Sequence, residues 1–236
     1  MQETITIFSD GAAKGNPGRG GYGAVISYHD RVVEIGAHKT RTTNNEMELT
    51  AVVESLKVVE RADAIVAIYT DSKYVVEGAK GWIFGWQKNG WKTKADTAVA
   101  NKELWQELAP LLKKITIEWH KVPGHVGIIG NERADTIASD FAEHGTFNLY
   151  NGPKTAYGFN IEDTSFDEAK ATERSDARKR SAQKAFSYIS AVDGVVQVHQ
   201  TWGECEKRVK GKKGVRFKKS LDAGNEREIV REFGGQ

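Results

Sequence analysis

The sequence predicts an α/β fold in which helices flank a five-stranded mixed sheet, followed by a small α+β domain. Two observations predict the α/β part: apolar runs of strand length recur up to residue 121, and helical periodicity falls between the later runs. The composition changes after Tyr150, which predicts a second domain. We expect a main domain at 1–148, a charged linker with helical character at 149–185 and a small basic domain at 186–236.

The first three strands are predicted from alternation of polar and apolar residues. Residues 4–9 alternate and lead to Asp10 at the end of the first strand. The segment 11–20 is rich in Gly, Asn and Pro and predicts a turn. Residues 21–29 and 32–41 have the pattern of a hairpin.

Helical and strand patterns follow one another in the middle of the chain. An apolar stripe from Met47 to Val59 predicts a helix capped by Thr43 or Asn44. The β-rich run 64–69 predicts a buried strand that ends at Asp71, and the next helix is expected to start at Ser72.

The last elements of the main domain are a helix at 101–112, a strand at 115–121 and a glycine-bearing loop at 122–130. Asn131 is expected to cap a final helix. Open α/β sheets place their sites at the carboxyl ends of strands. The acids that end two of the predicted strands should therefore lie at one edge of the sheet.

The second half of the chain has a different composition. Residues 166–185 are charged and contain few large apolar side chains, which indicates a linker. Apolar alternation returns from Phe186 and predicts the small domain. Residues 151–236 hold 17 Lys and Arg against 13 Asp and Glu, whereas residues 1–150 hold 17 against 19. Eight basic residues and no acid lie between Lys207 and Lys219, which favours a polyanionic partner.

Several classes of protein are disfavoured. The apolar runs are too short for a transmembrane helix, and the N-terminal residues lack the regions of a signal peptide. The single cysteine, Cys205, cannot form an internal disulfide, which suits a reducing compartment. We expect a cytoplasmic, monomeric protein with no membrane partner. The segment Gly18–Gly23 fits the pattern G-x-G-x-x-G, but it leads into a strand rather than a helix, so we expect no organic cofactor.

Four carboxylates stand in contexts that favour a metal site: Asp10, Glu48, Asp71 and Asp135. Each alone has an ordinary structural explanation as a turn, helix-surface or helix-dipole residue. Four acids brought together repel one another strongly unless cations compensate. Hard oxygen ligands from several elements suit two Mg²⁺ ions, with Mn²⁺ as a substitute.

Residues 1–145 resemble the type 1 ribonucleases H of bacteria along their whole length. The matching segments are Ser9-Asp10-Gly11, Gly15-Asn16-Pro17-Gly18, Gly20-Gly21-Tyr22-Gly23, Thr40–Asn45 with Met47-Glu48-Leu49, Thr70-Asp71-Ser72, Gly81-Trp82, Gly90–Thr93, Asn101 with Leu104-Trp105, Gly124-His125 and Asn131–Asp135. The resemblance implies a ribonuclease H-like fold and an endonuclease that hydrolyses the RNA strand of RNA–DNA hybrids with two metal ions, leaving 5′-phosphate and 3′-hydroxyl ends. It implies that the four acids are the metal ligands and that His125 assists proton transfer or product release.

The resemblance also implies substrate contacts. Asn16, Asn44 and Asn45 match positions that contact the RNA strand, although asparagine is also a common turn and cap residue. Ser72 stands where the family commonly has a glutamine, which places that RNA contact in question. The positions that match a DNA-phosphate pocket are Arg41, Thr43 and Asn101. Those that match the basic protrusion are Trp82, Trp86, Trp91, Lys88, Lys92 and Lys94, and the alternative for the tryptophans is a small aromatic core.

The C-terminal domain resembles the small hybrid-binding module of cellular ribonucleases H, also called viroplasmin-like. The resemblance implies DNA-strand contacts by Trp202, Phe217, Lys218 and Lys219. The chain departs from that family in the C-terminal position of the module, in the longer strand before Thr201 and in the lack of an aromatic-rich helix after Lys219. A basic surface on a dimerisation or linker module is the alternative.

Two alternatives to a cellular nuclease remain open. One is a catalytically silent hybrid-binding protein, which the presence of all four acids argues against. The other is a ribonuclease H domain of a retroelement polyprotein; Met1, the immediate strand and the C-terminal module favour a free-standing enzyme.

Overall fold

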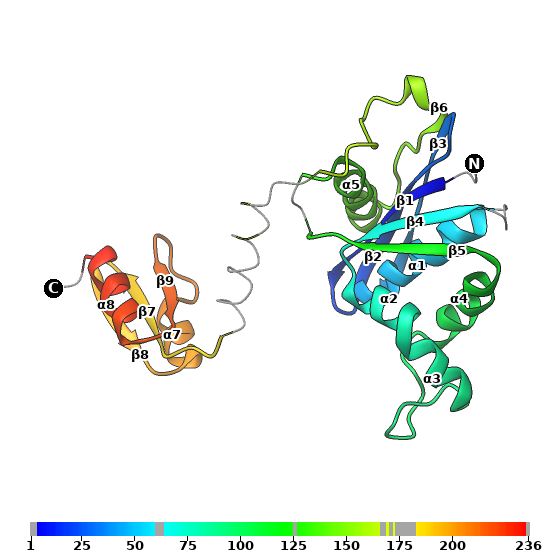
Figure 1. Cartoon of the computed structure of the whole chain (residues 1–236). Coiled ribbons are helices and arrows are strands. Elements are labelled where there is room, and N and C mark those ends of the chain that lie inside the picture. Colours follow the sequence, from blue (N-terminus) through cyan, green and yellow to red (C-terminus); the bar gives the residue numbers. More distant parts are fainter. Residues whose placement is uncertain are drawn as a thin grey trace. The chain divides into compact units, whose positions relative to one another are not determined.

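The computed structural model describes residues 4–59, 64–124, 127–165, 169, 172 and 183–234. The chain divides into two compact units, Met1–Ala171 and Thr172–Gln236, and each is described by itself (Figure 1). Among these residues, no helix has the length and apolar character that a membrane span requires.

A six-stranded mixed sheet forms the centre of the N-terminal unit, with the strand order β5-β4-β1-β2-β3-β6 (Figure 1). β1 runs parallel to β4, and β4 runs parallel to β5. The β1–β2, β2–β3 and β3–β6 pairs are antiparallel, which confirms the predicted α/β class and mixed sheet. The strands are β1 (Thr4–Gly15), β2 (Gly18–Ser27), β3 (Arg31–Thr42), β4 (Ile65–Thr70), β5 (Thr116–Lys121) and β6 (Asn151–Pro153).

β1 is longer than predicted. The turn expected at 11–20 is confined to the connection between Gly15 and Gly18, because Gly11 to Gly15 pair in register with Gly18 to Tyr22 of β2. Asp10 therefore lies inside β1 rather than at its end. Its pairing with β4 does end nearby, at Phe8 and Tyr69.

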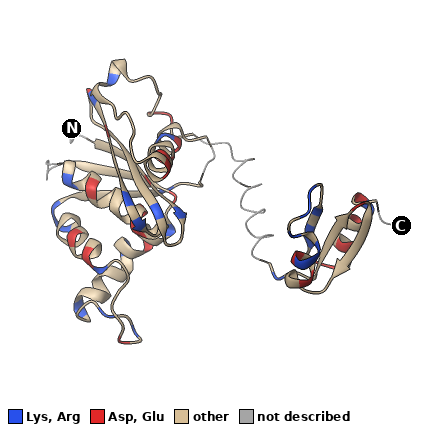
Figure 2. Ribbon diagram, turned by 180° about the vertical axis from the view of Figure 1, so that it is seen from behind, with Lys and Arg blue, Asp and Glu red and all other residues tan. Residues whose placement is uncertain are grey.

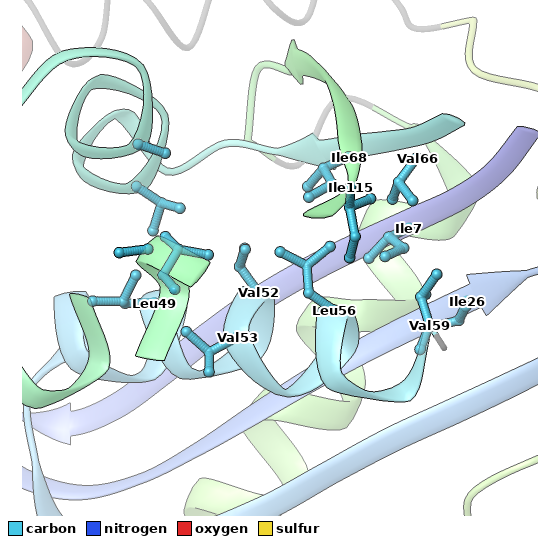
Figure 3. Packing of buried hydrophobic residues seen from close by; sticks show 14 of the residues in the cluster. Ile7, Ile26, Leu49, Val52, Val53, Leu56, Val59, Val66, Ile68 and Ile115 are labelled. Carbon is cyan, nitrogen blue, oxygen red and sulfur yellow. The ribbon is translucent and has the colours of Figure 1, made fainter. Parts of the chain in front are cut away.

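Helices cover both faces of the sheet. α1 (Asn44–Val58) packs Leu49, Val52 and Leu56 against Ile7 and Ile68 of the strands (Figure 3). α4 (Lys102–Lys114) joins the same core through Trp105 and Leu108. On the other face, α5 (Ile129–His144) packs Ala134, Ile137 and Phe141 against Phe8 and Val25. Ile7 and Phe8 point to opposite faces because side chains alternate along a strand.

The capping of the helices agrees with the sequence in two cases and differs in one. Thr43 caps α1 by accepting the Glu46 N–H at 3.3 Å, and Ser72 caps α2 (Lys73–Glu77) by accepting the Val75 N–H at 3.2 Å. The predicted cap at Asn131 is wrong, because α5 begins at Ile129. Ile128, the N-cap residue, is 1% exposed and packs in the core. Its burial fixes the start of α5 two residues before Asn131.

A protruding segment connects α2 to α4. The π-helix η1 (Gly78–Trp82) continues α2 and is followed by α3 (Ile83–Lys88) and a turn. Asn101, in the left-handed region with φ 56°, precedes α4. The helix predicted at 101–112 therefore begins one residue later, at Lys102, and ends two residues later, at Lys114.

Residues 147–161, which we call the strap, pack on the α5 side of the N-terminal unit. They contain β6, which pairs with Arg31–Val33 of β3, and the 3-10 helix η2 (Lys154–Ala156). Tyr157 and Ile161 are buried in the core beneath α5. The five predicted strands are thus joined by a sixth, and residues 149–161 of the expected linker are part of this unit. The charged stretch 166–185 lies largely outside the described residues.

The C-terminal unit is a three-stranded sheet between two helices. Its strand order is β8-β7-β9, with β7 (Ser187–Val192), β8 (Val195–His199) and β9 (Arg216–Ser220). Asp193 and Gly194, with φ 53° and 77°, form the two-residue turn between β7 and β8. α7 (Trp202–Val209) packs Cys205 and Val209 on Val192, and α8 (Ala223–Glu232) packs Ile229 and Phe233 on Ile189 and Ala191. The helices therefore cover opposite faces, as expected for a small α+β domain.

Candidate active site

Asp10 and Asp71 come from neighbouring parallel strands. Phe8 of β1 and Tyr69 of β4 are the last residues that pair, and each acid stands two residues further along the chain, Asp10 within β1 and Asp71 just after β4. The sequence predicted this meeting of two acids at one edge of the sheet. Parallel register brings equivalent positions of the two strands to the same edge.

Glu48 reaches this edge from the first turns of α1. The helix approaches β1 closely at Gly11, where an added Cβ would lie 2.2 Å from the Glu48 nitrogen. Asn44 donates its side-chain N–H to Glu48 Oε1 at 2.8 Å, and the Ser72 hydroxyl donates to Glu48 Oε2. Both carboxylate oxygens are thereby held in place by side chains that begin α1 and α2.

Asp135 comes from the opposite layer, on the second turn of α5. This helix lies against β2 at Gly23, which pairs with Asp10. An added Cβ at Gly23 would lie 2.4 Å from the Ala134 carbonyl oxygen. The glycines at 11 and 23 therefore allow a helix on each face of the sheet to approach the strand that carries Asp10.

The charges of the four acids influence one another. Asp10 is 8% exposed, and burial raises its pKa to about 8, with further contributions from the negative charges of Asp71, Asp135 and Glu48. The Gly11 N–H, which donates to the Asp10 carboxylate at 2.7 Å, opposes this shift. Burial also raises the pKa of Glu48, and Asp71 adds to the shift while the Ser72 and Asn44 bonds oppose it. The charges of the other three acids therefore act on Asp10, and that of Asp71 acts on Glu48.

The spacing of the acids is wider than that of ligands around a single ion. Within the described ranges, no three His, Cys, Asp or Glu side chains are placed closely enough to hold one metal ion. Mutual influence extends further than coordination, since carboxylates interact over several ångströms. The predicted auxiliary residue, His125, lies outside the described residues. Its neighbour Gly124 lies against Asp71, because an added Cβ there would be 2.4 Å from Asp71 Oδ2.

The residues predicted to contact RNA stand in the β1–β2 turn and at the start of α1. Asn16 is exposed at the β1–β2 turn, and Asn45 is exposed at the start of α1. Asn44 is engaged with Glu48. Ser72 stands where the related family commonly has a glutamine. Its hydroxyl donates to Glu48 and accepts the Val75 N–H at the start of α2.

The residues predicted to hold a DNA phosphate come from the end of β3, the start of α1 and the start of α4. Arg41 is exposed at the end of β3, and Thr43 caps α1. Asn101 donates to the Tyr74 hydroxyl at 3.1 Å and lines a hollow with Glu46 and Met47 of α1. The hollow thus connects Asn101 to the first turn of the helix that Thr43 caps.

The tryptophans of the predicted basic protrusion differ in exposure. Trp86 and Trp91 pack against the core, and the Trp86 ring lies 5.4 Å from the Trp105 ring. Trp82 is 40% exposed, although it contacts Trp86 at 5.7 Å. The packing of Trp86 and Trp91 fits the alternative, a small aromatic core, whereas DNA contact by the protrusion stays a prediction. Of the predicted lysines, Lys88 and Lys94 are exposed, while Lys92 forms an ion pair with Asp96 at 2.8 Å.

The predicted binding residues of the C-terminal unit lie on two different faces. Trp202 and Phe217 contact each other at 5.4 Å, and Tyr188 contacts Trp202 at 5.6 Å. Lys219 pairs with Tyr188 across the strands and shares this face. Lys218 faces the other way and forms an ion pair with Glu232 of α8 at 2.6 Å. In Figure 2, the ribbon of α7 and of the loop that leads to β9 is blue over several Lys and Arg residues.

Sequence reasoning missed two sets of residues near the site. Ser72 was read only as a helix start and a departure from a family pattern, not as a partner of Glu48. Arg133 and its buried partner Glu34, 99 positions apart, carry no local pattern that would connect them. Both relationships arise from packing between elements.

Comparisons with known proteins agree with this geometry. The family model described as RNase H matches residues 2–143. Ribonuclease H of Cupriavidus necator is 50% identical over 139 residues, which are 59% of this chain and 94% of that protein. Ribonuclease HI of Neisseria meningitidis serogroup A is 46% identical over 139 residues, covering 59% of this chain and 95% of that protein. The crystal structure of LC9-RNase H1, a type 1 RNase H with the type 2 active-site motif, has 27% identity and a TM-score of 0.57, covering 74% of this chain and 86% of that one. The chain therefore belongs to the RNase H family.

Proposed function

We propose that this ribonuclease H cleaves the RNA strand of RNA–DNA hybrids by a two-metal-ion mechanism that leaves 5′-phosphate and 3′-hydroxyl ends. The observation that carries the proposal is the mutual influence of Asp10, Glu48, Asp71 and Asp135, which come from four separate elements. Family membership supports the substrate class. The proposed ends follow from attack on phosphorus with the 3′-oxygen leaving.

The donor chemistry of the site fits Mg²⁺, with Mn²⁺ as a substitute. Carboxylate oxygens are the ligands that both ions prefer. A cation would also relieve the repulsion that, with burial, raises the pKa of Asp10 to about 8. When bound, two ions would activate the attacking water and stabilise charge on the leaving 3′-oxygen.

The remaining residues of the site position these acids and the substrate. Asn44 and Ser72 hold Glu48 through its two carboxylate oxygens. We assign RNA-strand contacts to Asn16, Asn44 and Asn45, whose amides can bond to 2′-hydroxyls. We assign DNA-phosphate contacts to Arg41, Thr43 and Asn101 and contacts with the DNA strand to the protrusion that carries Trp82, Lys88 and Lys94. We assign His125 an auxiliary role in proton transfer or product release.

The C-terminal unit is proposed to bind the hybrid. Trp202 is 40% exposed and Phe217 is 49% exposed, so both rings are available for contact. Exposed Lys207, Lys210, Lys212 and Lys213 lie on α7 and the loop that follows it. Aromatic faces beside ammonium groups suit a nucleic-acid strand. A second binding unit on the same chain would raise the local concentration of substrate at the first.

A cleavage assay on a strand-labelled RNA–DNA hybrid tests the main proposal. We expect RNA-strand cleavage with Mg²⁺ or Mn²⁺, none with a chelator and none by Asp10→Asn. End-labelling of the products distinguishes 5′-phosphate from 5′-hydroxyl ends. Binding of the hybrid without cleavage under any metal condition would favour the alternative, a catalytically silent hybrid-binding protein. The presence of all four acids supports the nuclease over that alternative.

The same proposal places a monomeric enzyme in the cytoplasm. The lone cysteine, Cys205, is buried, so it needs no oxidising compartment. Light scattering of the purified chain tests the monomeric state.

A further inference from the structure

A second buried carboxylate, Glu34 on β3, lies outside the four acids. Its side chain is 0% exposed. Arg133 of α5 donates Nε to Glu34 Oε1 at 2.6 Å and Nη2 to Oε2 at 3.0 Å. The Tyr157 hydroxyl donates to Oε1 at 2.6 Å, and the Tyr150 N–H donates to Oε2 at 2.9 Å. A buried charge with four charge-assisted bonds is held in one orientation.

The strap supplies the partners that enclose Arg133. The guanidinium lies 4.8 Å from the centre of the Phe147 ring and 4.9 Å from that of Phe159. Tyr157 lies between Tyr150 and Phe159, at ring distances of 4.9 and 5.3 Å. The family model ends at residue 143, so this enclosure is built by residues beyond the matched region.

The strap itself is anchored independently of Arg133. β6 pairs with β3, and the Lys154 N–H donates to the Asp30 carbonyl at 2.8 Å. Ile161 is 3% exposed in the core beneath α5. The Arg133 side chain is thus fixed between β3 on one side and an anchored segment on the other.

Arg133 precedes Asp135 by two positions on α5. Successive residues of an α-helix are about 100° apart, so residues two apart project to nearly opposite sides. Arg133 projects toward Glu34 and the strap, and the charge of Asp135 acts on Asp10. Because Arg133 is held on one side of α5, it fixes the rotation of the first two turns of the helix about its axis. That rotation sets the direction in which Asp135 points on the other side.

We propose that Arg133, held by Glu34 and the strap, is a positioning residue that orients Asp135 toward Asp10 for metal binding. This inference depends on the metal site proposed above. It assigns the strap to the catalytic unit, so a catalytic fragment must extend beyond residue 148 to include residues 149–161.

The test compares metal affinity with stability in the full-length chain. The double variant Tyr157→Phe, Phe159→Leu removes the hydrogen bond from Tyr157 to Glu34 and the aromatic ring that lies against Arg133. Both replacement side chains are apolar and similar in volume to the originals. Ile115→Val is the matched control, because Ile115 lies in the core on the other face of the sheet and contacts neither the strap nor Arg133. Mn²⁺ binding is measured by titration calorimetry and Tm by thermal unfolding with chelator. We expect the double variant to bind Mn²⁺ about tenfold more weakly than the parent chain, in the range seen for outer-shell partners of metal ligands.

The control separates positioning from general stability. Ile115→Val should lower Tm and leave the Mn²⁺ dissociation constant unchanged. Raising Mg²⁺ should restore hybrid cleavage by the double variant, since the four acids are intact. The proposal is overturned if the double variant lowers Tm with unchanged Mn²⁺ affinity, or if the control weakens binding equally. Tyr157→Phe alone supplies the same comparison if the double variant does not fold. Failure of the parent chain to bind Mn²⁺ would instead overturn the proposed metal site.

Discussion

Asp10 and Asp71 each follow by two residues the last pair of two parallel strands, Phe8 of β1 and Tyr69 of β4. Equivalent register makes these two acids neighbours, and Asp71 is the charged group with the largest effect on Asp10. The fold therefore assembles a repulsive pair before any substrate arrives. Such an arrangement lowers stability in return for a site that favours cations.

Asp10→Asn should separate the stability of the metal-free protein from its activity. Burial and the neighbouring acids raise the pKa of Asp10 to about 8, so this carboxyl lowers the stability of the metal-free fold at neutral pH. The substitution removes that cost, and we expect the free energy of unfolding in chelator to rise by about 0.5–2 kcal/mol. Hybrid cleavage should be lost at the same time. Urea unfolding with chelator, beside the cleavage assay, measures both. A less stable Asp10→Asn protein would contradict the repulsion between the acids.

Gly11→Ala should disrupt the approach of α1 to β1. The added methyl would lie 2.2 Å from the Glu48 nitrogen, a backbone atom that cannot move without the helix. We expect a loss of about 1–3 kcal/mol in stability, together with a large loss of cleavage because Glu48 is displaced. Gly85→Ala in α3, where no atom lies within 4 Å, is the matched control. It should be neutral or stabilising, since Ala favours helix over Gly. Equal effects of the two substitutions on unfolding would argue against the steric explanation.

Ser72→Ala should weaken metal binding through Glu48. The Ser72 hydroxyl donates to Glu48 and accepts the Val75 N–H, so its loss frees one carboxylate oxygen and uncaps α2. We expect about 1 kcal/mol of destabilisation from the cap and at least severalfold weaker Mn²⁺ binding by calorimetry. Ser72→Thr retains the hydroxyl and should restore the affinity. If Ala and Thr behave alike, the hydroxyl does not orient Glu48.

Glu34→Gln should change the pH dependence of stability. Burial acts to raise the pKa of Glu34, but bonds from Arg133, Tyr157 and the Tyr150 amide more than offset it, so the pKa lies below its ordinary value of 4.5. Stability from this group is therefore present above pH 4.5 and is lost as the pH falls through the lower folded value.

Urea unfolding at pH 7 and at pH 3 measures this dependence. The Gln variant should be less stable than the parent by about 3–5 kcal/mol at pH 7, because it breaks a buried pair, and the difference should shrink at pH 3. Glu143→Gln, which breaks an exposed pair with Lys14, should show little change at either pH. A difference that stays constant with pH would show that Glu34 ionisation contributes nothing.

Trp202→Ala and Lys218→Ala should differ in their effect on hybrid binding. Trp202 forms an exposed aromatic pair with Phe217, whereas Lys218 lies on the opposite face with Glu232. We expect Trp202→Ala to weaken hybrid binding by about 1–3 kcal/mol, the range for loss of a stacked base. Lys218→Ala should have only a small effect. Fluorescence anisotropy with a labelled hybrid at two salt concentrations measures both. A larger effect of Lys218→Ala would place the binding surface on the α8 face.

The sequence predicted the elements whose signals are local. The apolar stripe of α1, the caps at Thr43 and Ser72 and the buried run of β4 follow from periodicity and side-chain chemistry within a few residues. The four acids could be selected because the sequence pattern places each near a predicted strand end or in the first turns of a predicted helix, and because the surrounding segments match a known family.

Other features depended on contacts between distant residues. The end of β1 was misplaced because its Gly and Ala residues carry no alternation, and only pairing with β2 extends it. Asn131 resembles a cap in isolation, but burial of Ile128 moves the start of α5. The sequence of the strap shows no helical or strand period. Its conformation is set by contacts with β3, Arg133 and the core beneath α5, which a local pattern does not reveal.

The sequence by itself determined which side chains this protein has for metal and nucleic-acid chemistry, and in which local elements they stand. Only the tertiary structure decided how those side chains are held: Glu48 by Ser72, Arg133 by Glu34 and the strap, and Lys218 away from Phe217. The physical reason is the distance along the chain over which each kind of interaction acts. Propensity and periodicity act over a few neighbouring residues, whereas the orientation of a catalytic side chain depends on groups brought together from positions up to 123 residues apart, as Glu34 and Tyr157 are.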